Sequence, residues 1–301
     1  MDNVKYLLAS ETDHLWGIVT KTVGQQQIQS QSSYPAGDHP RDYMFSPDTG
    51  RILAEFQILY ITRGSGWFMS THCPRTVVQA GDAIMLMPGE WHSYAPDRRT
   101  GWTENWIGFT GDFVQHLLRL NFFSTVHPIL RVGFSDTLFA AFEQAVRVAR
   151  EEKPAYQQQL AGFVALIVGT IYAKSRQHPY KDNPDTDSIN LARRYMREHL
   201  SENINMEDVA REIGLGYSKF RKIFRGYTGF PPTQYFLNLK IEKAKDYLSS
   251  TSYSCKEIAF RLGFDSGSYF NKMFRQHTGI TPLEFRTQLQ DTPQKGLSEE
   301  E

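Results

Sequence analysis

Two sets of hydrogen-bonding side chains lie about fifty residues apart in the second half of the chain. The first set is Tyr217, Ser218, Arg221, Lys222 and Arg225, and the second is Ser266, Ser268, Asn271, Lys272 and Arg275. Arginine can bind guanine O6 and N7, asparagine can bind adenine N6 and N7, and serine or lysine can bind phosphate. No acid interrupts either set. The pattern therefore predicts contact with double-stranded DNA, and a solvated basic face is the alternative.

Helices must direct these groups to one side. Apolar residues recur at helical spacing through both sets, which predicts one buried stripe in each. The predicted stripes are Leu215, Phe220, Ile223 and Phe224 in the first helix and Phe270, Met273, Phe274 and His277 in the second. Ser254 and Glu257 predict a capping box that starts a shorter helix, and Gly263 predicts its end. A short helix, a glycine turn and a second helix are the layout of a helix-turn-helix unit.

The same layout occurs twice. Residues 209–214 (VAREIG) match residues 258–263 (IAFRLG) at a shift of 49, and residues 222–236 match residues 272–286 at a shift of 50. Residues 232–248 are expected to form one connecting helix of roughly 25 Å. With the width of the flanking helices, such a strut can place two recognition helices about 34 Å apart, which is one duplex turn.

Residues 189–289 resemble the DNA-binding domain of the AraC/XylS family of bacterial transcription regulators, which carries two such units. The resemblance implies a sequence-specific regulator that binds promoter or operator DNA and acts with RNA polymerase. One position that is often arginine in relatives is Lys240 here.

Composition and charge agree with this interpretation. A length of 301 residues with 40% apolar residues predicts two globular domains. The formal net charge is zero, but residues 186–290 carry +5, residues 1–185 carry −2 and residues 291–301 carry −3. Positive charge is thus concentrated where phosphate binding requires it.

Targeting and cysteine patterns predict a cytoplasmic protein. No run of eighteen apolar residues occurs, and the first ten residues lack the pattern of a signal peptide, which argues against a membrane partner. Cys73 and Cys255 are expected to be reduced thiols, with redox sensing as the alternative.

Residues 55–95 alternate between short apolar runs and turn formers such as RGSG at 63–66, which predicts a small antiparallel barrel or sandwich. Residues 102–105 continue it, and residues 106–110 are expected to be its last strand. Residues 1–50 have few periodic runs and predict an arm with one or two short strands.

A second resemblance concerns this barrel. Gly81-Asp82, Pro88-Gly89 and His92 resemble the second half of the cupin signature, and residues 56–66 are similar to a strand and turn of the arabinose regulator's sugar-sensing domain. Aromatic faces beside polar donors suit a sugar. The predicted pocket residues are His39, Tyr43, Arg51, Tyr60, Trp67, Met85, His92 and Trp106.

The barrel is predicted to hold neither a metal nor another cofactor. A metal-binding cupin needs an HxH pair, a glutamate and a later histidine, whereas this chain offers His72 followed by Cys73, and later His92. We therefore expect no catalytic residues and no enzyme. The alternatives are a cupin-type sugar-modifying enzyme fused to a DNA-binding domain, a structural DNA-bending protein, and a regulator of a non-carbohydrate stress or metabolite response.

Three amphipathic stretches follow the barrel, and they predict helices over residues 112–120, 135–152 and 157–174. In relatives such helices pair two subunits, so the resemblance implies a homodimer. The alternative is that these helices only cover their own barrel.

Together the patterns predict a two-domain α+β chain, with an N-terminal cupin-like antiparallel β-barrel with helices and an all-α C-terminal domain. The expected boundaries are residues 1–176 for the arm, barrel and dimerisation helices, 177–187 for a linker, 188–290 for the DNA-binding domain and 291–301 for an acidic disordered tail. The predicted function is activation of carbohydrate-utilisation genes in response to a small-molecule effector, a sugar.

Overall fold

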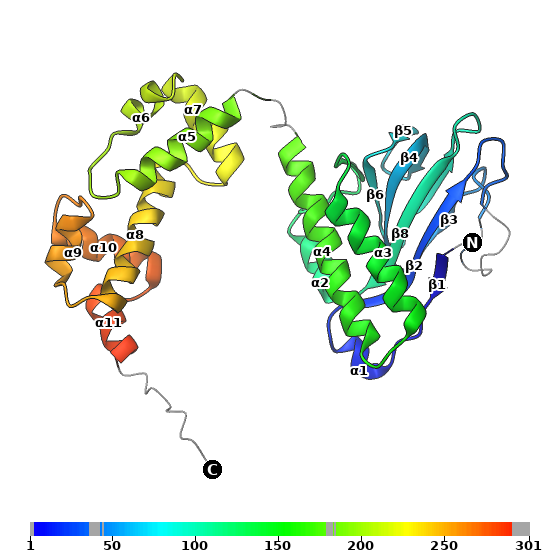
Figure 1. The fold of residues 1–301 in the computed structure, drawn as a ribbon, viewed down its shortest axis with the longest axis horizontal. Helices are drawn as coiled ribbons and strands as arrows, with labels where there is room; N and C mark the ends of the chain where they lie inside the picture. Colours follow the sequence, from blue (N-terminus) through cyan, green and yellow to red (C-terminus); the bar gives the residue numbers. More distant parts are fainter. Residues whose placement is uncertain (1–2, 36–42, 44, 179–182, 184, 291–301) are drawn as a thin grey trace, which may run out of the picture. The chain divides into compact units, whose positions relative to one another are not determined.

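The computed structural model describes residues 3–35, 43, 45–178, 183 and 185–290 (Figure 1). The chain divides into two compact units, residues 1–181 and residues 182–301. The first contains an antiparallel sheet with helices and the second is helical, which confirms the predicted fold class. The predicted tail, 291–301, lies outside the described residues.

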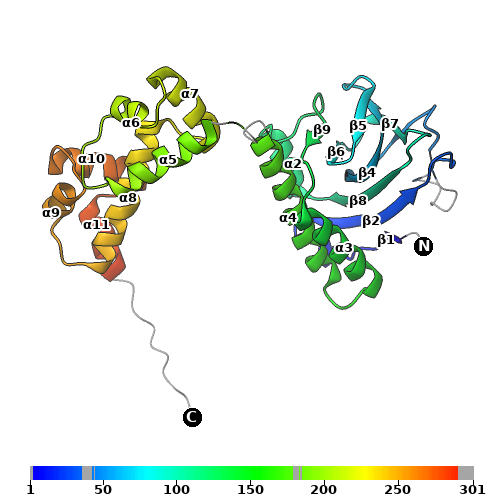
Figure 2. The same ribbon diagram turned by 45° about the horizontal axis from the view of Figure 1, so that its top comes forward.

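The described part of the N-terminal unit is built on nine antiparallel strands that curl around one another (Figure 2). They are β1 (Asn3–Tyr6), β2 (Val19–Ile28), β3 (Arg51–Ile52), β4 (Phe56–Ser70), β5 (Thr76–Gln79), β6 (Asp82–Leu86), β7 (Trp91–Pro96), β8 (Trp102–Thr110) and β9 (Ile129–Arg131). The main path is β1-β2-β8-β4-β6-β9, and the far half of β4 pairs with β5 and β7. Because β4 pairs on both sides along its length, it holds the two halves of the sheet together.

Three strand predictions are corrected. The predicted turn at residues 63–66 lies inside β4, where Gly64 takes a φ of 79° and passes close to Gly101. Strand β9 follows the expected last strand. The predicted arm contains the strands β1 and β2, as expected, but β2 is ten residues long and pairs with β1 and β8 inside the sheet. Thr20, Thr22 and Gln26 on β2 are buried polar residues, so the apolar alternation that marks a strand is weak there.

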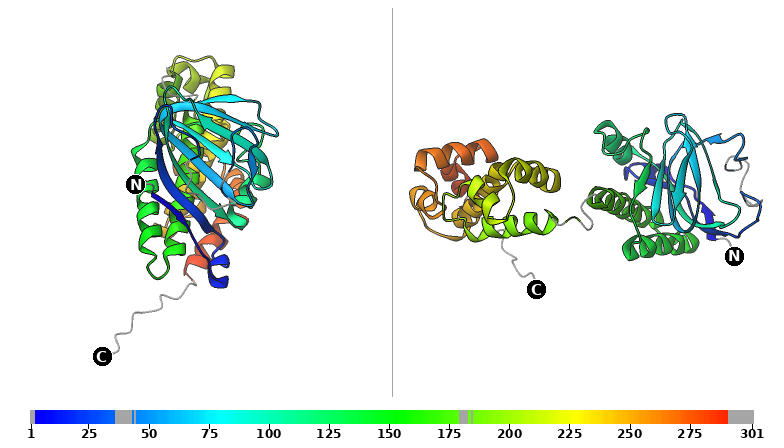
Figure 3. Two further views of the ribbon diagram at one scale, coloured as in Figure 1. Left: turned by 90° about the vertical axis from the view of Figure 1, so that its right-hand side faces the viewer. Right: turned by 90° about the horizontal axis from the view of Figure 1, so that it is seen from above.

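Within the described ranges the helices of this unit are α1 (Glu11–His14), α2 (Asp112–Arg119), α3 (Asp136–Glu151) and α4 (Tyr156–Gln177). The Ser135 hydroxyl accepts from the Leu138 amide and caps α3. Helices α3 and α4 pack together against β2, and Figures 2 and 3 show these green helices on one face of the sheet. Their apolar sides form one core with that face, as the alternative to subunit pairing requires.

Helix α2 packs on the core of this unit through part of its apolar surface. Val114 is its buried residue, Leu117 and Leu118 are half-buried, and Phe113 and Leu120 are exposed. None of the helices that the model describes is long and apolar enough to cross a membrane.

In the C-terminal unit, residues 185–290 form the helices α5 (Asp185–Glu198), α6 (Met206–Glu212), α7 (Tyr217–Thr228), α8 (Pro232–Ser250), α9 (Cys255–Arg261), α10 (Gly267–Thr278) and α11 (Pro282–Gln290). Helix α4 reaches Gln177 and α5 begins at Asp185, so the predicted linker 177–187 is too long at both ends. The side chain of Asn183 accepts from the Asp185 amide, which stabilises the earlier helix start.

The internal repeat is confirmed in atomic detail. The Thr228 hydroxyl donates to the Phe224 carbonyl at 2.7 Å, and Thr278 donates to Phe274 at 2.8 Å. The helices then end at Gly229 and Gly279, with φ of 82° and 84°. The predicted capping box between Ser254 and Glu257 is also formed, and the Asn205 side chain caps α6 by accepting from the Glu207 amide.

Candidate functional site

The outer surfaces of α7 and α10 carry the predicted DNA-contacting residues. On α7, Ser218, Arg221, Lys222 and Arg225 are exposed, whereas Tyr217 is half-buried against the core. On α10, Ser268, Asn271, Lys272 and Arg275 are exposed, and Ser266 caps the helix by accepting from the Tyr269 amide. Among the described residues, no carboxylate lies within salt-bridge distance of these lysines and arginines. Their donors are therefore free for phosphates and base edges.

The buried sides of the two helices match the prediction with one exception. Phe220 and Phe224 are fully buried in the first unit, and Phe270 and Phe274 in the second. His277, which was predicted to continue the second stripe, is exposed, with its Nε2 atom 3.3 Å from Gln234 Nε2.

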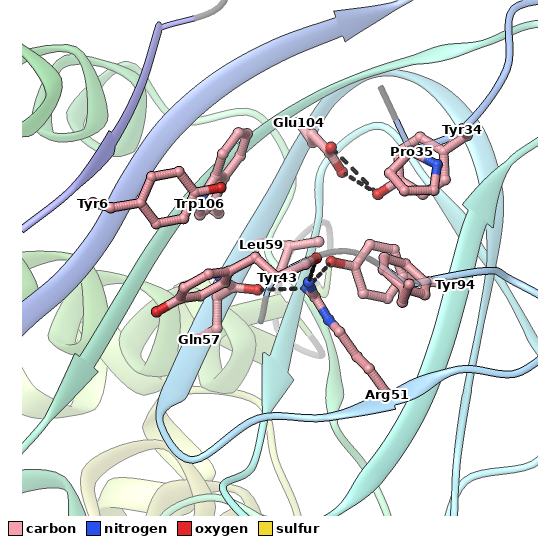
Figure 4. Close-up of a pocket in the computed structure, with 11 residues that line it drawn as sticks. Tyr6, Tyr34, Pro35, Tyr43, Arg51, Gln57, Leu59, Tyr94, Glu104 and Trp106 are labelled. Carbon is pink, nitrogen blue, oxygen red and sulfur yellow. Dashed lines mark hydrogen bonds between the residues drawn. The ribbon is translucent and has the colours of Figure 1, made fainter. Parts of the chain in front are cut away.

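A pocket opens in the curved sheet of the N-terminal unit (Figure 4). The cavity that the lining side chains leave is about 30 Å³, which is room for about one or two water molecules, so these side chains fill most of the space. Its lining residues are Tyr6, Tyr34, Pro35, Tyr43, Phe45, Arg51, Gln57, Leu59, Tyr94, Glu104 and Trp106. Phenol and indole rings therefore surround one guanidinium group and one carboxyl group.

Arg51 is held by uncharged acceptors. Its Nη1 donates to the Tyr43 carbonyl at 2.6 Å, and its Nη2 donates to the Tyr94 hydroxyl at 2.6 Å and to Gln57 Oε1 at 3.3 Å (Figure 4). The guanidinium carbon lies 4.6 Å from the centre of the Phe45 ring. In the described residues no carboxylate forms a salt bridge with Arg51, so its charge is available to a ligand.

His92 supports Arg51 from behind. Burial, together with the Arg51 charge, lowers the pKa of His92 to about 4, so the ring is neutral near pH 7. A neutral ring can donate from Nδ1 to the Glu90 carbonyl at 3.0 Å and accept at Nε2 from Arg51 Nε at 3.4 Å. The imidazole also stacks on Tyr94 at 6.1 Å.

Glu104 is the carboxyl group of the pocket and is 4% exposed. Its two oxygens accept from the Tyr34 hydroxyl at 3.4 and 3.2 Å. Burial raises the pKa of Glu104 to about 7, above its ordinary value of 4.5. A ligand hydroxyl could replace Tyr34 as the donor to this carboxyl group.

A buried network extends from the pocket to a second carboxyl group. Glu55 accepts from the Thr22 hydroxyl at 3.1 Å and from the Tyr43 hydroxyl at 3.1 Å. Burial raises the pKa of Glu55 as well.

Trp106 on β8 lies opposite Gly24 on the neighbouring strand β2. A methyl group added at Gly24 would be 2.4 Å from the indole ring, so glycine makes room for this wall of the pocket.

Of the eight predicted pocket residues, three line the pocket, namely Tyr43, Arg51 and Trp106. His92 is not a lining residue, but its ring contacts Arg51. Tyr60 and Met85 point the other way, into the core beneath α3 and α4, so that prediction is wrong. Trp67 lies in a separate groove, with the Arg75 guanidinium 4.1 Å from the centre of its ring system. His39 lies outside the described residues.

Several lining residues were not predicted from the sequence, among them Gln57, Leu59, Tyr94 and Glu104. Strand periodicity could have found Glu104, because it lies two residues before Trp106 on β8 and therefore on the same face. The aromatic residues Tyr6 and Tyr34 carried no such signal, because they come from segments that the sequence did not place on the sheet.

The residues considered as metal ligands do not come together. His72 is exposed in the loop after β4, with Nδ1 3.0 Å from Glu90 Oε1, and Cys73 is buried. Across the part of the chain that the model describes, no three His, Cys, Asp or Glu side chains are grouped to hold a metal ion.

Comparison with known proteins supports both domains. The family model described as "AraC-like ligand binding domain" matches residues 32–165, and a helix-turn-helix domain model matches residues 209–288. The MmsAB operon regulatory protein of Pseudomonas aeruginosa is 29% identical over 213 residues, which cover 70% of this chain and 67% of that protein.

Two further relatives are similar over most of their length. The raffinose operon transcriptional regulatory protein of Pediococcus pentosaceus is 25% identical, over 79% of this chain and 87% of that protein. The Msm operon regulatory protein of Streptococcus mutans is 24% identical, over 83% and 90%. With a ligand-binding domain, a duplicated helix-turn-helix domain and operon regulators as relatives, this chain belongs to the AraC/XylS family of DNA-binding transcription regulators.

Proposed function

We propose that this regulator is a cytoplasmic homodimer that activates carbohydrate-utilisation genes, acting with RNA polymerase, when a sugar binds in the N-terminal pocket. The observation that carries the proposal is the placement of Arg51 and Glu104 on different sides of one small, aromatic-walled space. Adjacent hydroxyls of a sugar can donate to a carboxyl group and accept from a guanidinium group or a phenol, while its CH face packs on an indole.

Relatives support the class of effector. Proteins named for the raffinose, lactose and arabinose operons are 25%, 24% and 27% identical to this chain over at least 70% of its length. The alternative is a regulator that senses another metabolite, and the name of the MmsAB operon regulatory protein refers to no sugar. We propose no catalytic role, since the relatives are transcription regulators.

The test is a thermal-shift screen of the full chain against monosaccharides, oligosaccharides and non-carbohydrate metabolites. A ligand at 100 times its Kd should stabilise the folded protein by about 2.7 kcal/mol. Trp106→Leu should abolish the shift, whereas Trp67→Leu, which removes an indole outside the pocket, should retain it. The bound sugar should then change operator binding or transcription. Shifts with non-carbohydrates alone would show that the effector is not a sugar.

A further inference from the structure

Among the described residues the two helix-turn-helix units have separate apolar cores, and α8 is the element that contributes to both. The first core holds Phe220 and Phe224, and the second holds Phe270 and Phe274. Helix α8 gives Phe236 to the first core and Ile241, Ala244 and Leu248 to the second, and it runs through both halves of the unit in Figure 1. Because one helix is shared, the relative orientation of the two cores depends on the contacts at the point where α8 passes from the first core to the second.

Lys240 lies at this point of α8 and contacts both units. It is 5% exposed, although lysine is almost never fully buried. Its ammonium group donates to the Glu202 carbonyl at 2.8 Å, in the loop before α6, and to the Gly263 carbonyl at 3.2 Å, in the turn between α9 and α10. It also lies 4.7 Å from the centre of the Phe236 ring and 5.3 Å from that of Phe264. One charged group thus binds one carbonyl and one ring from each unit.

Neighbouring contacts extend this junction, which we call the seam and define as Lys240 with residues 201–203 and 263–265. The Asn203 amide donates to Asp265 Oδ1 at 2.8 Å. Gly263 has a φ of 59°, and an added Cβ would lie 2.6 Å from the Ser201 carbonyl oxygen. The loop of the first unit and the turn of the second therefore meet closely enough to exclude a side chain.

The seam retains a charge where an apolar side chain would be less costly. Burial lowers the pKa of Lys240 to about 8, and a buried ammonium group has a substantial desolvation cost. Buried polar groups of this kind can serve to specify one arrangement among several. The arrangement at stake is the placement of α10 relative to α7, because both helices are attached to the seam through their own units.

We propose that Lys240 is a positioning residue that fixes the second helix-turn-helix unit against the first, so that both recognition helices bind one DNA site of fixed spacing. The inference rests on both α7 and α10 contacting DNA. When two binding elements are rigidly joined, binding by the first places the second at a high effective concentration at its own half-site, and a loose junction loses that gain.

The experiment uses the full chain and DNA duplexes that the parent protein selects from a randomised library. Each selected duplex is also prepared with one half scrambled and with one base pair inserted between the halves. The affinity for a complete site divided by the affinity for a half-scrambled site should fall by about tenfold or more in Lys240→Met. This variant should also shrink the penalty for the inserted base pair. Affinity for the half-scrambled sites should stay unchanged.

Three further variants make the result specific. Lys240→Arg keeps the donors and should restore most of the ratio. Lys245→Met removes a half-buried lysine of the same helix that lies outside the seam and is paired with Glu242 at 2.7 Å, and it should behave as the parent. Asn203→Ala breaks the seam at the surface and should reduce the ratio in the same direction by a smaller factor.

The proposal is overturned if Lys240→Met keeps the parent ratio and spacing dependence. It is also overturned if Lys240→Met loses affinity for complete and half-scrambled sites by the same factor and Asn203→Ala keeps the parent ratio of affinities. Lys240 would then contribute to folding alone. If the parent itself selects sites with a single half, the two-helix interpretation of DNA binding fails with it, and the parent's own data identify that failure.

Discussion

At the scale of single residues, the buried carboxyl group of Glu104 links folding to pH. Its pKa is about 7 in the folded protein and 4.5 in the ordinary state, so the folded protein favours the protonated form. The stability that this preference contributes is fully present below about pH 4.5 and is lost as the pH rises through about 7. Above that pH the buried charge costs about 3 kcal/mol.

Glu104→Gln should therefore be more stable than the parent at pH 8, by up to about 3 kcal/mol, and nearly equal to it at pH 4. All five tryptophans, Trp16, Trp67, Trp91, Trp102 and Trp106, lie in the N-terminal unit. Tryptophan fluorescence during urea unfolding thus reports this unit within the full chain. A parallel pH dependence of variant and parent would contradict the prediction.

The pKa of His92 is shifted in the opposite direction, so its contribution to stability has the opposite dependence on pH. Its pKa is lowered from 6.5 to about 4, so its stability contribution is present above pH 6.5 and lost as the pH falls through about 4. Because both proteins in the Glu104→Gln comparison contain His92, its effect cancels in their difference.

The second prediction at this scale concerns Arg221, Arg225, Asn271 and Arg275 on the recognition helices. Replacing a base-contacting residue by alanine should cost about 1 to 3 kcal/mol and relax specificity at one position. Loss of a phosphate contact should weaken all sequences alike and reduce the salt slope by about one unit. Binding of the full-length variants to a library-selected duplex at several salt concentrations separates the two cases.

The matched control is Arg194→Ala, which removes an exposed arginine on α5 that lies 3.9 Å from Glu198. It should bind as the parent does, and circular dichroism should show every variant to be folded. If all four recognition-helix variants bind as tightly as the parent, α7 and α10 do not present these faces to DNA.

At the scale of elements, the separate cores predict that the two helix-turn-helix units can be damaged independently. Phe224→Ala and Phe274→Ala each remove a fully buried ring and should cost roughly 3 to 5 kcal/mol. Each should destabilise its own unit and abolish binding to its own half-site first. Thermal melting followed by circular dichroism measures the stability of each variant, and binding to duplexes with one half scrambled measures each half-site. Phe260→Ala, which removes an exposed ring, is the control. Equal loss of both half-sites from either core variant would show a single cooperative unit.

At the scale of the whole molecule, the proposed homodimer needs a surface on helices that already cover their own sheet. Phe139 on α3 is 41% exposed and Leu166 on α4 is 45% exposed, so each helix keeps an apolar residue on its outer side. We expect a dimer in sedimentation experiments and a monomer after Phe139→Glu combined with Leu166→Glu. Phe134→Glu changes a residue that is 72% exposed outside these helices and should remain dimeric. A monomeric parent would refute this part of the proposal.

The sequence alone determined the DNA-binding half because its signals are local. A capping box needs residues three apart, such as Ser254 and Glu257, and a helical stripe needs neighbours three and four apart. The repeat doubled each signal, so helices and turns were placed correctly. His277 was misassigned because it lies at the end of its stripe, where the packing of neighbouring helices decides exposure.

The tertiary structure alone decided the pocket and the seam. Tyr60 and Leu59 are adjacent on β4, and which of them faces the pocket depends on pairing with β6 and β8, whose residues are distant in the chain. Lys240 reads as one charged residue on a helix, yet its partners lie 38 and 23 residues away. Local sequence fixes backbone periodicity, whereas burial and charge environment arise from segments that only folding brings together.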